Sequence, residues 1–352
     1  MNAIKRHIVF LIPGFPENEA DVNCIPILQT YILYYHKANP GIKVSVITFQ
    51  YPFEKRNYQW NGIDIYAIGG ANKKGVYRIS TWLKVLLCFR KLNKEDKVSV
   101  IQSFWLTQCA LVGQYIASIF KTKHISTIVG QDPLPSNKYL KHINFSKTTL
   151  ISLSDFAAEK FKETTGKNVQ HVISIGLDIE NFKKEPSDSP RIDILGVGNL
   201  HAVKNYKLFI EIVEELIVSF PNLKCKIVGT GEDLEMLEHL IIEKKLGGNI
   251  ELTNELLRNK VLELMADSKI FLHPSLHEGQ GYVFAEALYA GMTIVAFKVG
   301  NLISSERVAT CKSKEEMIER LKFYLTNKLD RKRMLIQSME DTISKFNKIY
   351  FT

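Results

Sequence analysis

Two distant stretches of the 352-residue sequence repeat one pattern, in which an apolar run is followed by an amphipathic helix and a second apolar run. In the first stretch the three segments are Arg6–Ile12, Ala20–Lys37 and Lys43–Thr48. In the second stretch they are Arg191–Val197, Tyr206–Ser219 and Lys224–Val228. Because strands that alternate with helices are typical of a parallel sheet covered by helices, the pattern predicts an α/β fold with two doubly wound domains.

A polar stretch between the two patterns marks the domain boundary. The chain is long enough for two domains with full cores, and 45% hydrophobic with 24% charged residues is ordinary for a folded protein. At residues 183–190 the apolar periodicity gives way to polar residues and prolines before a new strand begins. We therefore expect an N-terminal domain over 1–176 and a C-terminal domain over 190–333.

The five cysteines are scattered and show no paired metal-ligand spacing, so we expect reduced thiols in a cytoplasmic protein and no structural metal. The basic start of the chain leads into an apolar run that stops at Pro13–Gly14, which is typical of a first strand and not of a signal peptide. No apolar segment is long enough to span a bilayer. The protein is expected to be soluble or peripheral.

The net charge of +9 favours an anionic partner, which could be nucleic acid, a membrane surface or a phosphorylated substrate. Nucleic acid is the weakest of the three, because no binding motif appears and the lysines are not interleaved with aromatic residues. The segment Arg78–Lys94 has the pattern of a basic amphipathic helix. Such a helix either covers the sheet or lies on a membrane with anionic headgroups, and both interpretations stay open.

The stretch His273–Gly300 holds two acids and a glycine-rich turn. The glycines let the backbone approach a ligand, and the helix expected over Tyr282–Tyr289 offers unpaired N–H groups and a positive dipole end to a phosphate. Glu278 on the turn and Glu286 in the helix could accept hydrogen bonds from hydroxyls on either side of that anion, as a nucleotide sugar would require. The alternative is that Glu278 caps a helix and Glu286 faces solvent.

Three further positions follow the ends of expected strands. Lys204 lies at the head of a helix, where its ammonium group could neutralise a diphosphate; the alternative is a solvated surface lysine. The turn Gly229–Gly231 is too short for a dinucleotide fingerprint, and Glu232 after it is either a partner of the helix dipole or a ligand. Gly14 permits close approach to a ligand at the carboxyl edge of the first sheet, or is a plain turn residue.

Several short motifs of the C-terminal half occur together. They are Pro274-Ser275, Glu278-Gly279, Gly281, Glu286-Ala287 and Gly291, followed by the strand Thr293–Phe297. Together they resemble the donor-site signature of glycosyltransferase family 4, strongly over 195–300 and weakly over the first 150 residues. The resemblance implies a GT-B fold, with two Rossmann-like domains facing a central cleft, and transfer of a sugar from a nucleotide-diphosphate sugar to an acceptor hydroxyl with retention of configuration.

The resemblance also implies roles for individual residues. Lys204 and Glu278 would be the catalytic residues, on the diphosphate and the sugar hydroxyls respectively, and Glu286 would hold the ribose hydroxyls. The other residues expected on the donor side are Gly14, Asn199, Gly231, Glu232, Gly279, Gln280, Gly281 and Tyr282, with the amides of 279–282 on the phosphates. As in family members, the donor's own phosphate oxygen would take the acceptor proton, with no metal or other cofactor.

Two positions depart from the family pattern. Val129 stands where relatives often have a histidine, and Asn199 stands where they usually have an arginine. On the acceptor side the candidate contacts are Trp105 and Asp132, although an aspartate before Pro133 is also a common turn signal. These departures keep two alternatives open, a catalytically silent nucleotide-sugar-binding subunit and, less favoured, a sugar-nucleotide epimerase.

For the acceptor, the resemblance implies a contact with a membrane. Many relatives act on saccharide or lipid-linked acceptors and carry a basic amphipathic helix, so the helix at 78–94 is a candidate contact with the inner face of the plasma membrane. The implied role is cell-envelope polysaccharide or glycolipid synthesis. After Gly300 the chain is shorter than in relatives, and we expect two final helices, Lys314–Thr326 and Leu329–Lys348, with 334–352 packing across the domain junction.

Overall fold

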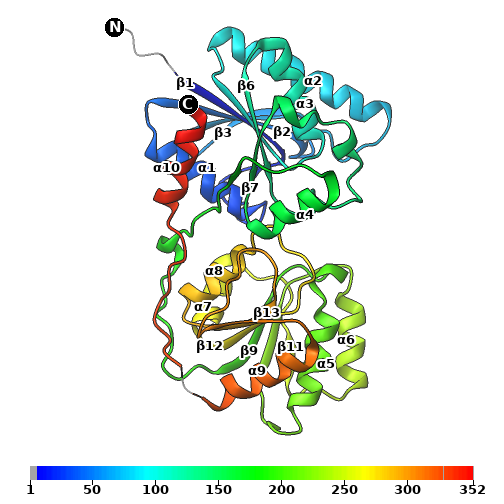
Figure 1. Ribbon diagram of the computed structural model, residues 1–352, viewed down its shortest axis with the longest axis vertical. Coiled ribbons are helices and arrows are strands. Elements are labelled where there is room, and N and C mark those ends of the chain that lie inside the picture. Colours follow the sequence, from blue (N-terminus) through cyan, green and yellow to red (C-terminus); the bar gives the residue numbers. More distant parts are fainter. Residues whose placement is uncertain (1–5, 328, 352) are drawn as a thin grey trace. The chain divides into compact units, whose positions relative to one another are not determined.

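The computed structural model describes residues 6–327 and 329–351, and Figure 1 labels their helices and strands. The chain forms two compact units. The N-terminal unit takes in the described residues up to Gly176 together with those from Met339 on, and the C-terminal unit runs from Leu177 to Ser338. The chain therefore leaves the N-terminal unit and returns to it for a last helix. Residues 1 and 352, which bound the predicted domains, lie outside the described range.

The N-terminal unit is built on an eight-stranded sheet in the order β3-β4-β2-β1-β5-β6-β7-β8. Its strands are β1 Arg6–Gly14, β2 Ile42–Tyr51, β3 Arg56–Trp60, β4 Ile63–Ala67, β5 Val100–Phe104, β6 Lys123–Ile128, β7 Thr149–Ser152 and β8 His171–Val172. Neighbouring strands are parallel except β3 and β4, which form an antiparallel pair at the edge of the sheet. Residues 8–12 of β1 are fully buried, because helices cover a central parallel strand on both faces.

Five α-helices are described in this unit, and two of them, α1 and α10, begin later than predicted. They are α1 Pro26–Ala38, α2 Val76–Glu95, α3 Gln108–Phe120, α4 Asp155–Thr165 and α10 Met339–Phe351. Helix α4 begins with a side-chain cap, since Ser154 Oγ accepts a hydrogen bond of 3.0 Å from the amide of Ala157. The predicted start of α1 at Ala20 is wrong, because Pro26 occupies the first turn of the helix and the residues before it form separate turns.

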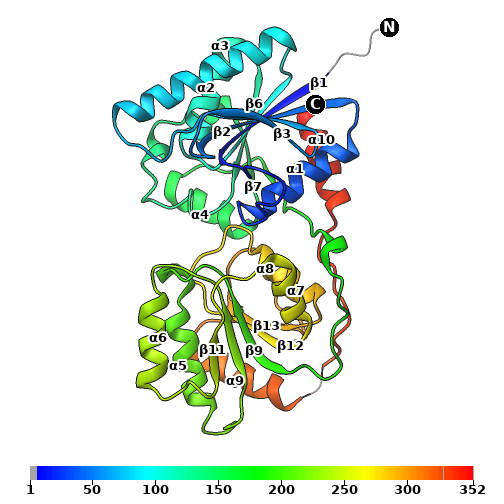
Figure 2. The ribbon, with the colours of Figure 1, turned by 180° about the vertical axis from the view of Figure 1, so that it is seen from behind.

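Helix α10 lies against α1, and the two views of the ribbon agree on this (Figures 1 and 2). The hydroxyl oxygens of Tyr31 and Tyr350 are 2.7 Å apart, and the Tyr35 hydroxyl donates to Asn347 Oδ1 at 2.7 Å. The ring centroids of Tyr31 and Phe346 are 4.9 Å apart. Helix α10 therefore completes the aromatic part of the N-terminal core.

The segment before α10 is not helical, so the helix predicted over Leu329–Lys348 is wrong in its first half. Arg331 donates from Nη1 to the Ser268 carbonyl at 2.7 Å and from Nη2 to the Ala266 carbonyl at 3.0 Å. These bonds hold a non-helical segment against the C-terminal unit. Their acceptors are distant in sequence, and local periodicity does not report such partners.

The C-terminal unit is built on a parallel six-stranded sheet in the order β11-β10-β9-β12-β13-β14. Its strands are β9 Ile192–Val197, β10 Cys225–Val228, β11 Ile250–Leu252, β12 Ser268–His273, β13 Thr293–Phe297 and β14 Val308–Cys311. Its α-helices are α5 Tyr206–Leu216, α6 Leu234–Glu243, α7 Arg258–Ala266, α8 Tyr282–Tyr289 and α9 Lys314–Thr326. The second doubly wound unit is confirmed, and β14 is an edge strand that was not predicted.

The strand order of the C-terminal sheet reverses between β9 and β12. From β9 the chain winds outward through β10 and β11, and then returns to form β12 on the other side of β9. In open α/β sheets, ligands bind at the carboxyl ends of the strands at such a switch point. The fold therefore makes the loops after β9 and β12 the first place to look for a site.

Helix α2 both covers the sheet and leaves an apolar stripe uncovered. Its buried residues are Thr81, Val85, Phe89 and Leu92. On its outer side, Leu83 and Leu87 are 56% and 61% exposed. No helix in the described part of the chain, α2 included, is long and apolar enough to cross a membrane.

We predict that Phe346→Ala lowers the free energy of unfolding of the N-terminal unit by about 3 kcal/mol, because a fully buried ring is lost from the contact of α10 with α1. All three tryptophans lie in this unit, so tryptophan fluorescence during urea denaturation reports its unfolding. Lys345→Ala, an exposed change on the same helix, should stay within about 0.5 kcal/mol of the parent protein. Equal effects of the two changes would contradict the packing of α10 on α1.

Candidate functional site

The loop after β9 carries Lys204 at the end of a short 3-10 helix, η4 Ala202–Lys204. The loop after β12 is hydrogen-bonded to it. The amide of Leu276 donates to the Val203 carbonyl at 2.9 Å, and Ser275 Oγ donates to the same carbonyl at 3.3 Å. The two loops at the switch point of the sheet are thus fixed to each other.

Lys204, His273 and Glu278 meet at a single carboxylate oxygen. Lys204 Nζ lies 2.5 Å from Glu278 Oε1, and His273 Nε2 donates to the same oxygen at 2.7 Å. The side chain of Glu278 is 12% exposed and that of His273 is 1% exposed. Within the described residues, Glu278 Oε2 accepts no hydrogen bond. This cluster therefore holds one oxygen of the carboxylate and leaves the other for a donor group of a ligand.

The charges of this cluster follow from burial and contact. Burial by itself raises the pKa of Glu278, but the hydrogen bond from His273 and the charge of Lys204 outweigh it and lower the pKa to about 2. Burial lowers the pKa of His273, so its imidazole is neutral at pH 7 and donates through Nε2–H. Glu278 is thus a fixed negative charge balanced by one ammonium group.

Two buried polar atoms beside this cluster have no hydrogen-bond partner in the described structure. They are the Tyr206 hydroxyl and His273 Nδ1. A Cβ placed on Gly198 would lie 3.1 Å from the Tyr206 hydroxyl and 3.9 Å from His273 Cε1, so this glycine keeps the space between them open. A buried polar atom without a partner costs about 1–3 kcal/mol, which a ligand that supplies the partner would offset.

Helix α8 begins directly after the glycine-rich turn. Gly281 has a φ of +71°, and a Cβ there would lie 2.4 Å from the Phe284 ring, so the turn requires glycine at this position. The Gln280 carbonyl accepts a hydrogen bond of 2.9 Å from the amide of Asn301, which anchors the turn to the loop after β13. Gly279 and Gln280 are buried. The turn is therefore a rigid entry to the helix that carries the second acid.

Glu286 is held by Arg258 at the start of α7. The two side chains form an ion pair in which Glu286 is 7% and Arg258 22% exposed. The guanidinium carbon of Arg258 lies 5.8 Å from the ring centroid of Tyr282. The Tyr282 hydroxyl accepts a hydrogen bond of 3.3 Å from the amide of Asp178. Burial acts against it, but the charge of Glu286 raises the pKa of Arg258. Arg258 Nε is buried without an acceptor in the described structure, so the pair has an N–H left for a ligand.

The loop after β10 lies against the loop after β9. A Cβ on Gly231 would lie 2.2 Å from the Leu200 carbonyl oxygen, so the close approach of the two loops requires glycine. Glu232 and Asn199 are both exposed, and Glu232 Oε1 lies 3.5 Å from His201 Nδ1. The structure thus brings the backbone of this turn to the site and leaves the two predicted side chains at the surface.

Three of the predicted contacts, Gly14, Trp105 and Asp132, belong to the N-terminal unit. Gly14 ends β1, where an added Cβ would lie 3.1 Å from Tyr51 Cβ. Trp105 follows β5 with a φ of +66°, a left-handed conformation that bulky residues rarely adopt. The carboxylate of Asp132 accepts hydrogen bonds from three amides, those of Leu106 at 2.8 Å, Val129 at 3.2 Å and Gly130 at 2.8 Å. Asp132 therefore joins the loop after β6 to the loop after β5 and is satisfied without a ligand.

Sequence reasoning missed two residues of the C-terminal site, His273 and Arg258. His273 has a local signal, since it ends a strand and stands five positions before Glu278. Arg258 has none, because only the packing of α7 on α8 brings it to Glu286. The site therefore contains a buried hydrogen-bond donor, His273, and a cation, Arg258, that the motif alone does not indicate.

A family comparison matches the part of the chain that holds these clusters. Residues 178–339 match the family model described as glycosyl transferases group 1. The matched segment nearly coincides with the C-terminal unit, and both charged clusters lie inside it.

Curated relatives match over different shares of their length. The chain is 24% identical over 311 residues to the phosphatidylinositol N-acetylglucosaminyltransferase gpi3 subunit of Schizosaccharomyces pombe, which covers 83% of this chain and 68% of that protein. It is 26% identical over 131 residues to the GPI3 subunit of Saccharomyces cerevisiae, which covers 35% of this chain and 29% of that protein. The chain thus spans about two thirds of the first relative and under one third of the second.

Solved structures share the fold. Anabaena HepE in complex with UDP-glucose has a TM-score of 0.68 to this chain at 16% identity, covering 98% of both chains. At this identity the likeness concerns the fold alone. It confirms the predicted class, an α/β protein of GT-B type.

We predict that Glu278→Gln weakens the dependence of the free energy of unfolding of the C-terminal unit on pH at acidic pH. The pKa of Glu278 is lowered from its ordinary value of 4.5 to about 2 in the folded protein. The charged carboxylate therefore stabilises the fold fully above pH 4.5, and this stabilisation is lost as the pH falls from 4.5 toward 2. Urea unfolding at a series of pH values, followed by circular dichroism, measures this. Tryptophan fluorescence identifies the transition of the other unit.

The matched control for this experiment is Glu232→Gln, which changes an exposed glutamate of the same unit. Its stability curve should follow that of the parent protein. Superimposable curves for all three proteins would contradict the buried charge cluster.

Proposed function

Because residues 178–339 of this chain belong to the glycosyl transferases group 1 family, we propose that the protein is a retaining glycosyltransferase that moves a sugar from a nucleotide-diphosphate sugar to an acceptor hydroxyl. The observation that carries the proposal is the contact between Lys204 and Glu278, which joins the two loops at the switch point of the C-terminal sheet. A cation and a carboxylate fixed there suit a donor that is both anionic and rich in hydroxyls. The related fold of HepE was solved with UDP-glucose, which supports this donor class.

Lys204 is the proposed partner of the donor diphosphate. Its side chain is 21% exposed, so the ammonium group can reach a ligand oxygen while it keeps its contact with Glu278. As the bond between the sugar and the diphosphate breaks, negative charge builds up on the leaving diphosphate. A positioned ammonium group stabilises that charge more in the transition state than in the bound donor, which is what accelerates the reaction.

Glu278 is the proposed partner of the sugar hydroxyls. Lys204 and His273 occupy Oε1, and a sugar hydroxyl would donate to Oε2. Because the pKa of Glu278 is about 2, the carboxylate is an acceptor throughout the physiological range. The neutral imidazole of His273 would keep the carboxylate oriented when the donor binds.

Glu286 is the proposed partner of the ribose hydroxyls. Its ion pair with Arg258 balances its charge, so the carboxylate would not repel the nearby diphosphate. A ribose hydroxyl would donate to Glu286, and a ribose or phosphate oxygen would accept from the buried Nε of Arg258. The nucleoside would thus complete a pair that is incomplete without it.

We further propose that the acceptor is presented at a membrane surface, on the inner face of the plasma membrane, in cell-envelope polysaccharide or glycolipid synthesis. Large apolar side chains that are 55% to 74% exposed gather on α2 and α3, namely Val76, Tyr77, Ile79, Leu83, Leu87, Tyr115 and Ile119. The exposed basic residues of α2 are Lys84, Arg90, Lys91 and Lys94. Such a combination suits a surface that meets anionic lipid headgroups. The name of the fission yeast relative, which includes phosphatidylinositol, supports a lipid acceptor.

A catalytically silent nucleotide-sugar-binding subunit is the second candidate. The observation that favours it is Asn199, which is exposed and stands where the family pattern has an arginine. Such a subunit would bind the donor through the same clusters without breaking the bond between the sugar and the diphosphate.

We predict that the protein slowly hydrolyses one member of a panel of UDP- and GDP-sugars and that Lys204→Ala and Glu278→Ala each lower the rate about 100-fold, because each removes a group that stabilises the transition state. Lys207→Ala, an exposed change in the first turn of α5, is the matched control and should keep the parent rate. Release of nucleoside diphosphate measures the rate, and thermal shift measures donor binding. Binding without hydrolysis or transfer would favour the silent subunit.

We predict that Arg258→Ala weakens UDP binding about tenfold, because it leaves the buried carboxylate of Glu286 without its cation. Isothermal titration calorimetry with UDP measures the affinity, and Arg258→Lys should restore part of it. Lys260→Ala, which removes an exposed lysine of the same helix, should bind UDP as the parent does. An unchanged affinity of Arg258→Ala would remove Glu286 from the nucleoside site.

A further inference from the structure

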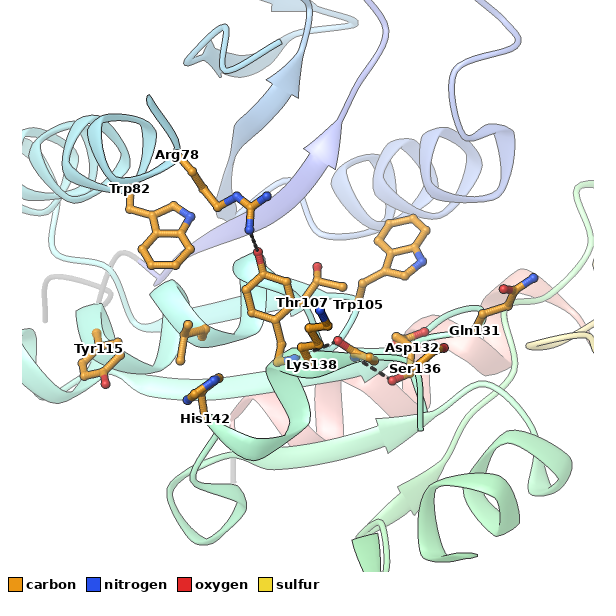
Figure 3. A pocket seen from close by; sticks show the side chains of 13 residues that line it. Arg78, Trp82, Trp105, Thr107, Tyr115, Gln131, Asp132, Ser136, Lys138 and His142 are labelled. Atoms are coloured by element: carbon orange, nitrogen blue, oxygen red, sulfur yellow. Dashed lines mark hydrogen bonds between the residues drawn. The ribbon is translucent and has the colours of Figure 1, made fainter. Parts of the chain in front are cut away.

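The N-terminal unit holds an open cavity of about 980 Å³, large enough for a ligand of several rings. Its walls come from α2, α3 and the loops after β5 and β6. Figure 3 shows the pocket from close by, with Arg78 and Trp82 of α2 facing the side chains of the loop after β6. None of the contacts proposed for the donor uses this cavity.

The charged groups that line the pocket are cationic with one exception. Arg78 Nη1 donates to the Tyr139 hydroxyl at 3.2 Å, which holds the guanidinium group at the wall (Figure 3). Lys138 lies on the loop after β6 and lines the same cavity. Within the described residues, neither Arg78 nor Lys138 forms an ion pair. Asp132 is the exception, and its carboxylate already accepts hydrogen bonds from three amides of the loops after β5 and β6, so the cavity favours an anion.

Aromatic rings form the apolar part of the lining. Trp82 Nε1 donates to Gln108 Oε1 at 3.1 Å, which fixes the plane of the indole. Trp105 keeps its place at the cost of a left-handed backbone, a strain of about 1–3 kcal/mol that is typical of functional positions. In Figure 3, Trp82 and Tyr115 lie toward one end of the pocket and Trp105 toward the other. Rigid rings of this kind bind the carbon-bearing faces of a ligand at little entropic cost.

The mouth of the pocket continues into the exposed apolar stripe of α2 and α3. Tyr115 lines the cavity and is 63% exposed, so it belongs to both surfaces. Trp82 lines the cavity, and Ile79, which lies three residues before it on the same side of α2, is 55% exposed. A ligand with an anionic head and an apolar chain would thus find a cationic, aromatic cavity for the head and an uncovered apolar surface for the chain.

We propose that this pocket binds the phosphate-bearing headgroup of an anionic membrane lipid, whose chains lie along the exposed stripe. Arg78 and Lys138 bind the phosphate, and the aromatic rings contact the rest of the headgroup. The inference rests on the proposed function, since this lipid would be the acceptor, and it names the chemical class of that acceptor. An inorganic anion alone would leave the aromatic lining and the apolar mouth unused.

A titration with short-chain lipids tests the proposal. Trp82 and Trp105 line the pocket, whereas Trp60 is buried against Phe15 at 4.8 Å between ring centroids and supplies a constant signal. Dihexanoylphosphatidylglycerol should produce a saturable change in tryptophan fluorescence, and dihexanoylphosphatidylcholine should not. Equal binding of the two lipids, or equally effective competition by inorganic phosphate, would overturn the headgroup assignment.

Charge-matched variants locate the binding site. Arg78→Ala/Lys138→Ala should raise the dissociation constant for dihexanoylphosphatidylglycerol at least about tenfold, because both charge-assisted contacts are lost. Lys141→Ala/Lys147→Ala removes the same charge from exposed positions outside the cavity lining and should keep the parent value. Equal weakening in the two double variants would show non-specific attraction and overturn the proposal.

Two further measurements keep the outcomes distinct. Should the pocket variant melt below the parent protein, Lys138→Ala alone, a change of an exposed side chain, gives the same comparison without the guanidinium contact to Tyr139. Donor hydrolysis by the parent protein separates this inference from the proposed function. Lipid binding without any donor hydrolysis or transfer contradicts the glycosyltransferase, whereas hydrolysis without lipid binding contradicts the headgroup pocket.

Discussion

A charged carboxylate, shielded from water and held by one ammonium group and one imidazole, is the interaction on which the C-terminal unit depends. Taking such a carboxylate out of water costs several kcal/mol, and the attraction of a single partner seldom returns a surplus. Glu278 has two partners, and together they outweigh this cost, since they lower the pKa of the carboxyl group to about 2. The fold keeps it in place by bonding the loop after β12 to the carbonyl of Val203 and by starting α8 from a turn that only glycine fits.

Both acids of the glycine-rich stretch are neutralised by cations from other segments, Glu278 by Lys204 and Glu286 by Arg258. Two uncompensated carboxylates would repel a diphosphate by several kcal/mol in a site of low dielectric. Pairing each acid with a cation removes that repulsion and leaves oxygen acceptors in place for hydroxyls. If the proposed donor binds here, selectivity for an anionic molecule rich in hydroxyls would follow from the arrangement of charges, without an excess of positive charge at the site.

The order of strands and helices could be predicted because parallel strands covered on both faces leave continuous apolar runs, and the helix over Tyr282–Tyr289 is confirmed to the residue. The helix expected over Leu329–Lys348 fails where Arg331 bonds to carbonyls distant in sequence, which no periodicity records. In the site, Lys204 and Glu278 follow strand ends and could be anticipated, whereas Arg258 depends on how two helices pack. The roles of all the predicted site residues toward donor and acceptor, those of Asn199, Gly14 and Glu232 included, stay predictions.

The return of α10 to the first unit has a consequence for biosynthesis. A ribosome that translates this chain releases all of residues 177–338 before the helix that completes the earlier-made half. Until residues 339–351 leave the ribosome, the rings of Tyr31 and Tyr35, which α10 later covers, are exposed to solvent. Domains fold as units during translation. The C-terminal unit can therefore fold before the N-terminal unit has all of its residues, and the N-terminal unit needs protection from aggregation in the interval.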